Sequence, residues 1–191
     1  MIDLPLSSLL VSAGTVTLSE IGDKTQLLAL LLAARFRKPL PIIAGIFVAT
    51  LLNHAVSAWL GTVIAHWLTP EVLRWVVAVC FIAIALWTLK PDTLEDDAKL
   101  PAHGAFIATT IAFFLAEIGD KTQVATALLA TKYSPLWQVI SGTTLGMLIA
   151  DVPVVLLGAR FAHKLPLKAA RITAAIVFLA LGLWVAIRGI G

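Results

Sequence analysis

The sequence has little charge and almost no cysteine. Only 13% of its 191 residues are charged, whereas 60% are hydrophobic, and a typical soluble domain is about 25% charged. With a mean hydropathy of +0.97, this composition excludes a soluble globular domain and predicts an all-α integral membrane protein. Cys80 is the single cysteine, so an intrachain disulfide is excluded. The first ten residues lack the basic segment of a secretory signal, so we expect them to belong to the first helix.

Basic residues are scarce outside short clusters between the apolar runs. In a soluble protein the pI of 9.2 would point to nucleic-acid binding. In a membrane protein such clusters are typical of topology signals. We therefore expect the lipid bilayer, and no nucleic acid, as the partner of the outer surface.

Apolar runs of membrane-spanning length are separated by proline, glycine or charge. They cover residues 6–34, 40–63, 72–89, 103–131, 135–160 and 170–189. The sequence thus predicts six transmembrane helices. At about 1.5 Å per residue, the first and fourth runs are longer than the ~30 Å hydrocarbon core. We expect these two helices to be tilted or broken, with the glycine or the threonine of the motif described below at the break.

The distribution of lysine and arginine predicts how the helices are oriented. One side of the membrane would hold both termini and three basic residues, and the other side nine. The side with nine is cytoplasmic by the positive-inside rule. We therefore predict a multi-pass protein of the cell inner membrane with both termini on the non-cytoplasmic side. The acidic run DTLEDD, residues 92–97, is interpreted as a solvated cytoplasmic linker, with a cation-attracting or regulatory segment as the alternative.

The motif EIGDKTQ occurs twice, at residues 20–26 and 117–123. The match between the halves continues at a constant offset of 97 residues, pairing Gly45 with Gly142 and Phe81 with Phe178. This register indicates an internal duplication. Because each half has three spans, the second copy enters the membrane from the opposite side. We predict one transmembrane domain, 1–191, made of inverted three-helix repeats 1–90 and 103–191 and a cytoplasmic connector 91–102.

The motif places acidic side chains near the middle of the membrane. Glu20 lies 15 residues before Arg35 and 14 after Leu6, and Glu117 lies at an equivalent depth. A charged side chain at that depth costs at least about 2.5–3.5 kcal/mol on the insertion scale. Glutamate and aspartate three residues apart share a helical face, so facing repeats would bring four carboxylates together. With the two motif lysines the formal charge is −2, which matches one divalent cation or two protons.

The side chains at this depth offer mainly oxygen donors, which suit Mn²⁺, Ca²⁺ and Mg²⁺. The predicted metal ligands are Glu20, Asp23, Glu117, Asp120, Asp151, Asn53, Gln26 and Gln123. Lys24 and Lys121 would balance charge, and Thr25, Thr122 and His54 are further candidates. At the 97-residue offset Asp151 aligns with His54, so the site is not strictly two-fold symmetric. Pro153 is expected to kink the fifth helix beside Asp151 and to free carbonyls there.

The doubled E-x-G-D-K-T motif on the first and fourth predicted helices resembles the Gdt family of manganese and calcium transporters. The family pattern is Glu-x-Gly-Asp-Lys/Arg-Thr/Ser in each half, and both copies fit it without departure. The resemblance implies a cation/proton exchanger that exports Mn²⁺ in bacteria, with protons and Mn²⁺ or Ca²⁺ as substrates. It implies that the motif acids bind the ion, and no resident cofactor or catalytic residue is expected.

Several alternatives stay open. A salt-bridge network that only fixes helix packing would pair Glu20 with Lys24, and Glu117 with Lys121. A lysine-exporter-like exporter of small solutes, or a passive channel, would use the same spans. A metal-dependent intramembrane enzyme needs a nucleophile with a positioned base, or an arginine cluster for phosphate. The sequence shows neither at the depth of the motif, so we expect a transporter rather than an enzyme.

Overall fold

The protein is described by a computed structural model over residues 7–90, 104–158 and 167–189. Within these residues the chain forms eight helices and no strand, which confirms the all-α prediction. The helices are α1 Ser7–Glu20, α2 Lys24–Phe36, α3 Pro39–Trp67, α4 Pro70–Thr88, α5 Ala105–Glu117, α6 Lys121–Lys132, α7 Leu136–Leu157 and α9 Leu167–Arg188. The predicted connector 91–102, with its acidic run 92–97, lies outside the described residues.

Four of the described helices are long and apolar enough to cross a membrane. They are α3, α4, α7 and the part of α9 from Arg171 to Arg188. Tryptophans lie exposed near the ends of these helices, with Trp67 85% and Trp137 57% accessible. Tryptophan is enriched at membrane–water interfaces, so their positions match those of interfacial anchors. The chain is therefore a multi-pass membrane protein.

The first and fourth apolar runs are each divided into two shorter helices, α1–α2 and α5–α6. At each division a glycine has a positive φ, 84° at Gly22 and 74° at Gly119. Side chains with a Cβ rarely adopt this conformation, whereas glycine does so at little cost. The predicted break at the motif glycine is confirmed. The prediction of a break at the threonine is wrong, because Thr25 and Thr122 lie in the first turns of α2 and α6.

Polar residues of the motif lie at the start of the helix that follows each break. Asp23 and Asp120 are the N-cap residues of α2 and α6, with φ, ψ of −83°, 168° and −78°, 163°. The Gln26 side-chain oxygen accepts a hydrogen bond from the N–H of the first break glycine, at 3.0 Å. Gln123 does the same for the second glycine, at 2.7 Å. Acceptors at a helix start satisfy N–H groups that have no partner within the helix, so the motif itself encodes both breaks.

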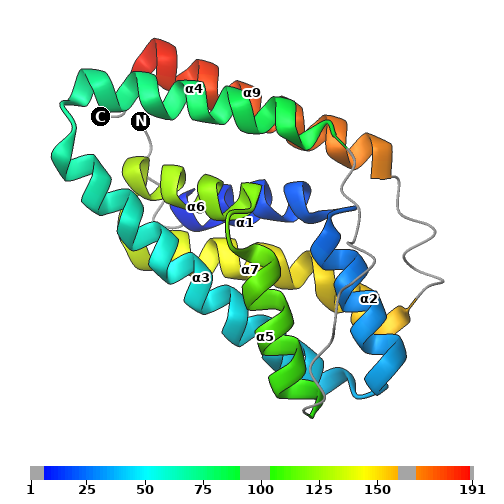
Figure 1. Cartoon of the computed structure of the whole chain (residues 1–191). Coiled ribbons are helices and arrows are strands. Elements are labelled where there is room, and N and C mark those ends of the chain that lie inside the picture. Colours follow the sequence, from blue (N-terminus) through cyan, green and yellow to red (C-terminus); the bar gives the residue numbers. More distant parts are fainter. Residues whose placement is uncertain (1–6, 91–103, 159–166, 190–191) are drawn as a thin grey trace.

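Helices from the first half of the chain pack mainly against helices from the second half. The closest pairings are α1 with α7, α3 with α5 and α6, and α4 with α9. In Figure 1, α4 and α9 run side by side along one edge of the bundle. Phe81 of α4 stacks on Phe178 of α9 with ring centroids 6.3 Å apart. These two phenylalanines are counterparts at the 97-residue offset.

Close contacts between the halves also recur at this offset. A Cβ added at Gly45 of α3 would come within 2.7 Å of the Thr109 side chain of α5. Its counterpart Gly142 of α7 would meet the Ser12 side chain of α1 at 2.9 Å, and Ser12 is the counterpart of Thr109. Small residues allow helix backbones to approach closely in membranes. The same packing device therefore joins α3 to α5 and α7 to α1.

The proline that is predicted to kink the fifth predicted helix lies within one helix of the structure. Pro153 lies inside α7, which runs from Leu136 to Leu157. Proline has no backbone N–H, so the carbonyl of Ile149 lacks its usual helical donor. This carbonyl lies within one turn of Asp151, and the next carbonyl, of Ala150, accepts a hydrogen bond from Gln26 of α2.

Candidate functional site

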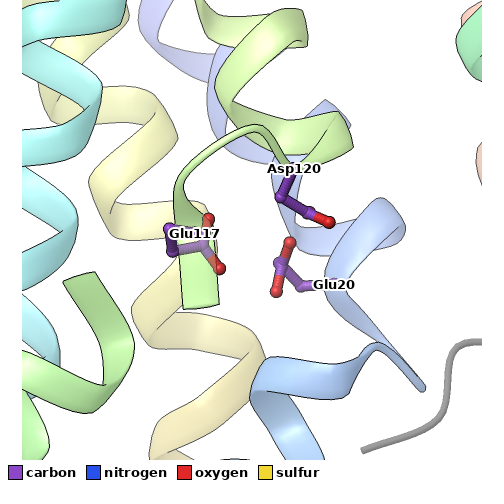
Figure 2. Close-up of side chains that lie close together, drawn as sticks. All are labelled: Glu20, Glu117 and Asp120. Carbon is purple, nitrogen blue, oxygen red and sulfur yellow. The ribbon is translucent and has the colours of Figure 1, made fainter. Parts of the chain in front are cut away.

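Three carboxylates meet where the two broken helices come together. Glu20 ends α1, Glu117 ends α5 and Asp120 begins α6. Each offers one oxygen, and these oxygens lie within 4.8 Å of one another. Figure 2 shows Glu117 and Asp120 on either side of the α5–α6 break, with Glu20 facing them from α1. All three side chains are buried, with at most 2% exposed. Oxygens at this spacing can all contact one hard divalent cation.

A threonine holds one oxygen of each glutamate. The Thr25 hydroxyl donates to Glu20 Oε2 at 2.5 Å, and the Thr122 hydroxyl donates to Glu117 Oε2 at 2.9 Å. The other oxygen of each glutamate, Oε1, is buried without a hydrogen-bond partner among the described residues. A buried carboxylate oxygen without a partner is costly unless a cation or a proton compensates it. The donor set therefore fits a divalent cation of the Mn²⁺ or Ca²⁺ type.

The motif lysines form ion pairs between the two copies. Lys24 Nζ lies 3.0 Å from Asp120 Oδ1, and Lys121 Nζ contacts Asp23 Oδ1. The packing alternative instead pairs each lysine with the glutamate of its own copy. The two pairs differ in exposure, because the Lys24 side chain is 29% accessible and the Lys121 side chain only 3%. Each pair joins one half of the chain to the other.

Asp151 and His54 lie at counterpart positions on α7 and α3. Both are fully buried. Neither the carboxylate oxygens of Asp151 nor the ring nitrogens of His54 have a hydrogen-bond partner within the described segments. The Asp151 carboxyl group lies close enough to Glu20 and Glu117 to interact with both electrostatically. Asp151 thus adds a carboxyl group beside the cluster from α7, whereas the counterpart position on α3 carries the imidazole of His54.

Two amide side chains, those of Gln26 and Asn53, form hydrogen bonds between helices. Gln26 Nε2 donates to the Ala150 carbonyl of α7 at 3.0 Å, directly before Asp151. Asn53 Nδ2 donates to the Phe114 carbonyl of α5 at 3.1 Å, three residues before Glu117. The oxygens of Gln26 and of its counterpart in the second copy already accept backbone N–H groups. Gln26 thus joins α2 to α7, and Asn53 joins α3 to α5.

The structure brings together most of the side chains predicted from the sequence, but their partners were not predictable. Thr25 and Thr122, which the sequence predicts only as further candidates, each contact a glutamate directly. A threonine five residues after each glutamate, in both copies, was the available signal. Asp23 lies outside the group of three converging carboxylates, although its counterpart Asp120 belongs to it.

Comparison with protein families gives a match over nearly the whole chain. The sequence model of the family described as Divalent cation/proton antiporter GDT1 matches residues 8–96 and 105–191. The two matched stretches begin 97 residues apart, which is also the offset between the two copies of the motif. No solved structure gives a significant match.

Individual relatives come from bacteria and plants. A protein of Vibrio cholerae serotype O1 named "Putative manganese exporter" is 55% identical over 179 residues, which cover 93% of this chain and 90% of that protein. A "GDT1-like protein" of Synechocystis is 27% identical, covering 85% of this chain and 88% of its own length. The chloroplast protein PAM71 of Arabidopsis thaliana is 29% identical, covering 84% of this chain and 51% of its own length.

Proposed function

The chain belongs to the GDT1 family of divalent cation/proton antiporters, and on this premise we propose that it exports Mn²⁺ from the cytoplasm in exchange for protons. Membership in this family makes the protein a cation transporter rather than an enzyme. The name of the Vibrio cholerae relative favours manganese as the ion. Ca²⁺ is the second candidate ion, because the donors are mainly oxygens.

The observation that carries the proposal is the buried group of Glu20, Glu117 and Asp120. Three carboxylates from both motif copies lie within reach of one ion, and two of their oxygens have no hydrogen-bond partner among the described residues. In low dielectric such a group cannot stay fully ionised without compensating cations. A divalent ion compensates it in one step of the cycle, and protons compensate it in the return step. Ion export is thereby coupled to inward proton movement.

We further propose that the fold consists of two inverted three-helix repeats, residues 1–90 and 103–191, within one transmembrane domain. The first repeat would contain the broken helix α1–α2 with α3 and α4, and the second α5–α6 with α7 and α9. Contacts that recur at the 97-residue offset support this arrangement. Inverted-repeat transporters place their substrate near the midplane, between broken helices of the two repeats. Rocking of one repeat against the other would expose the ion to each side in turn.

The remaining predicted residues receive supporting roles in this proposal. Asp151 adds negative charge beside the ion, and Asn53, Gln26 and Gln123 position the breaks. Lys24 and Lys121 balance the charge of the aspartates. The protein would lie in the cell inner membrane with the lysine- and arginine-rich side in the cytoplasm.

The test is ion flux into proteoliposomes of the purified protein under an imposed pH gradient. We expect Mn²⁺ uptake that saturates with Mn²⁺ concentration and follows the proton gradient. Asp120→Asn removes one carboxylate from the group of three and should lower flux at least about a hundredfold, since a charged ligand at a buried site is lost. Thr62→Ser, at an exposed hydroxyl that bonds only within α3, is the matched control and should keep wild-type flux.

Three outcomes would contradict the proposal. Absence of Mn²⁺ and Ca²⁺ flux in the wild-type protein would exclude a divalent-cation transporter. Flux of lysine or another amino acid without metal flux would favour a small-solute exporter. Flux that neither saturates nor responds to the pH gradient would favour a passive channel.

A further inference from the structure

The four motif carboxylates do not occupy equivalent positions in the structure. Glu20, Glu117 and Asp120 offer converging oxygens, whereas Asp23 lies outside this group. Both aspartates are nevertheless buried, N-cap a half-helix and pair with a lysine of the other copy. Identical sequence in the two motifs has therefore produced two different arrangements.

The two lysine pairs also differ between the copies. Asp23 is held by Lys121, which is 3% exposed, while Asp120 pairs with Lys24, which is 29% exposed. The Lys24 side chain is less enclosed by protein than that of Lys121, so we expect Asp120 to exchange its lysine for another cation more readily. A buried pair is strongly destabilised when one partner is removed, so Asp23 stays with Lys121.

The contacts around the two pairs are reciprocal. Lys24 and Lys121 are counterparts at the 97-residue offset, as are Asp23 and Asp120. Contacts between equivalent groups in a two-fold arrangement come in such reciprocal sets. An opposite arrangement, with Asp23 beside the glutamates and Asp120 held by a buried Lys24, would use the same residue pairs. A chain with both arrangements would have a discrete pair of states for its ion site.

We propose that Glu20 and Glu117 stay on the transported ion throughout the cycle, while Asp120 and Asp23 alternate as the third carboxylate. The aspartate that is not on the ion is held by the lysine of the opposite motif. Lys24 and Lys121 are thus positioning residues that decide which aspartate faces the ion, and each half-cycle exchanges one for the other. This inference rests on the proposed function.

The experiment compares Mn²⁺ binding and Mn²⁺ transport for Asp23→Asn, Asp120→Asn and the double variant. Binding of Mn²⁺ alone to the purified full chain is followed by the paramagnetic resonance signal of the free ion. We expect each single variant to bind Mn²⁺ within about tenfold of wild type, because the other aspartate completes the site in the other arrangement. The double variant should bind at least about a hundredfold more weakly. Both single variants should lose transport, since each can hold the ion in only one state.

Equal loss of binding in the single and double variants would overturn the inference, because it would mean that all four carboxylates bind together. Wild-type transport in Asp23→Asn would also overturn it, by removing Asp23 from the cycle. Absence of Mn²⁺ binding and flux in the wild-type protein would instead contradict the proposed function itself.

The lysines provide a second measurement that does not depend on the double variant folding. Lys121→Gln should keep Mn²⁺ binding within about tenfold and lose transport, because Asp23 is no longer held away from the ion. Lys121→Arg keeps the positive charge and should restore part of the transport. A purely structural lysine would lower binding and transport in parallel, and that result would overturn the inference.

Discussion

At the scale of single residues, Gln26 and Gln123 hold the same place in the motif but have different surroundings. Gln26 is 4% exposed and makes two bonds, from the Gly22 N–H and to the Ala150 carbonyl. Gln123 is partly exposed and accepts one bond, from the Gly119 N–H. Since Gln26 makes two bonds and Gln123 makes one, the two glutamines are expected to contribute unequally to stability.

We therefore expect Gln26→Leu to destabilise the protein more than Gln123→Leu. The first change leaves the Gly22 N–H without a partner, at about 1–3 kcal/mol, and also removes the bond to the Ala150 carbonyl, at about 0.5–1.5 kcal/mol. The second change leaves only the Gly119 N–H without a partner, at about 1–3 kcal/mol. Thermal unfolding of the purified variants in detergent measures this difference. Equal losses in both variants would contradict the assigned bonds.

At the scale of elements, the broken helices place the carboxylates. Each break consists of a glutamate that ends one helix, a glycine with positive φ, and an aspartate at the N-cap position of the next. A continuous helix would hold its carboxylates on one face beside their own lysine four residues on. The break instead turns the lysine toward the other copy, as the two ion pairs show. The glycine conformation therefore controls the geometry of the site.

Gly119→Ala tests this dependence. An added Cβ at Gly119 meets nothing within 4 Å, so the whole effect comes from its φ of 74°. We expect a loss of about 1–2 kcal/mol in stability, the cost of a left-handed conformation in a residue with a Cβ, together with reduced Mn²⁺ flux. Thermal unfolding and proteoliposome flux measure the two effects.

The matched control for this change is Gly14→Ala. Gly14 lies inside α1, is exposed, and also has nothing within 4 Å of an added Cβ. Because alanine favours a helix interior over glycine by about 1 kcal/mol, this variant should be neutral or more stable. A Gly119→Ala variant as stable as Gly14→Ala would mean that the break does not depend on glycine.

At the scale of the whole molecule, each half of the chain is packed against the other. α1 contacts α7, α5 contacts α3, and α4 contacts α9. Close approaches at Gly45 and Gly142 repeat across these pairs. The orientation of such an assembly in the membrane depends on its short basic loops. The proposed arrangement, with an odd number of spans in each half and residues 91–102 in the cytoplasm, would place both termini on the opposite side.

Topology reporters check this orientation. We expect alkaline phosphatase fused after residue 191 to be active, because that enzyme folds outside the cytoplasm and both termini are predicted there. A fusion after residue 91, in the connector, should be inactive. A green fluorescent protein at the same two positions should give the reverse pattern. An active connector fusion would mean that the orientation is inverted.

The predictability of the site differs among its residues. Glu20 and Glu117 could be placed together because the motif repeats at one offset and lies at mid-membrane depth. The glycine break could be predicted from the excess length of two apolar runs. The partner of Lys24 could not be predicted, because a lysine four residues after a glutamate is also well placed for an ion pair within one helix. The alignment of His54 with Asp151 could be predicted from the sequence. That both side chains lack a hydrogen-bond partner among the described residues could not be predicted.

The sequence by itself determined the membrane class, the apolar runs, the duplicated motif and the acidic residues of the site. These follow from hydropathy, spacing and side-chain chemistry, which are local properties of the chain. Only the tertiary structure decided that Lys24 and Lys121 reach the aspartates of the opposite copy, and that Asp120 rather than Asp23 joins the two glutamates. The physical reason is that these partners are almost a hundred residues apart. Their distances depend on how the halves pack, and two identical motifs acquire different surroundings only when that packing departs from symmetry.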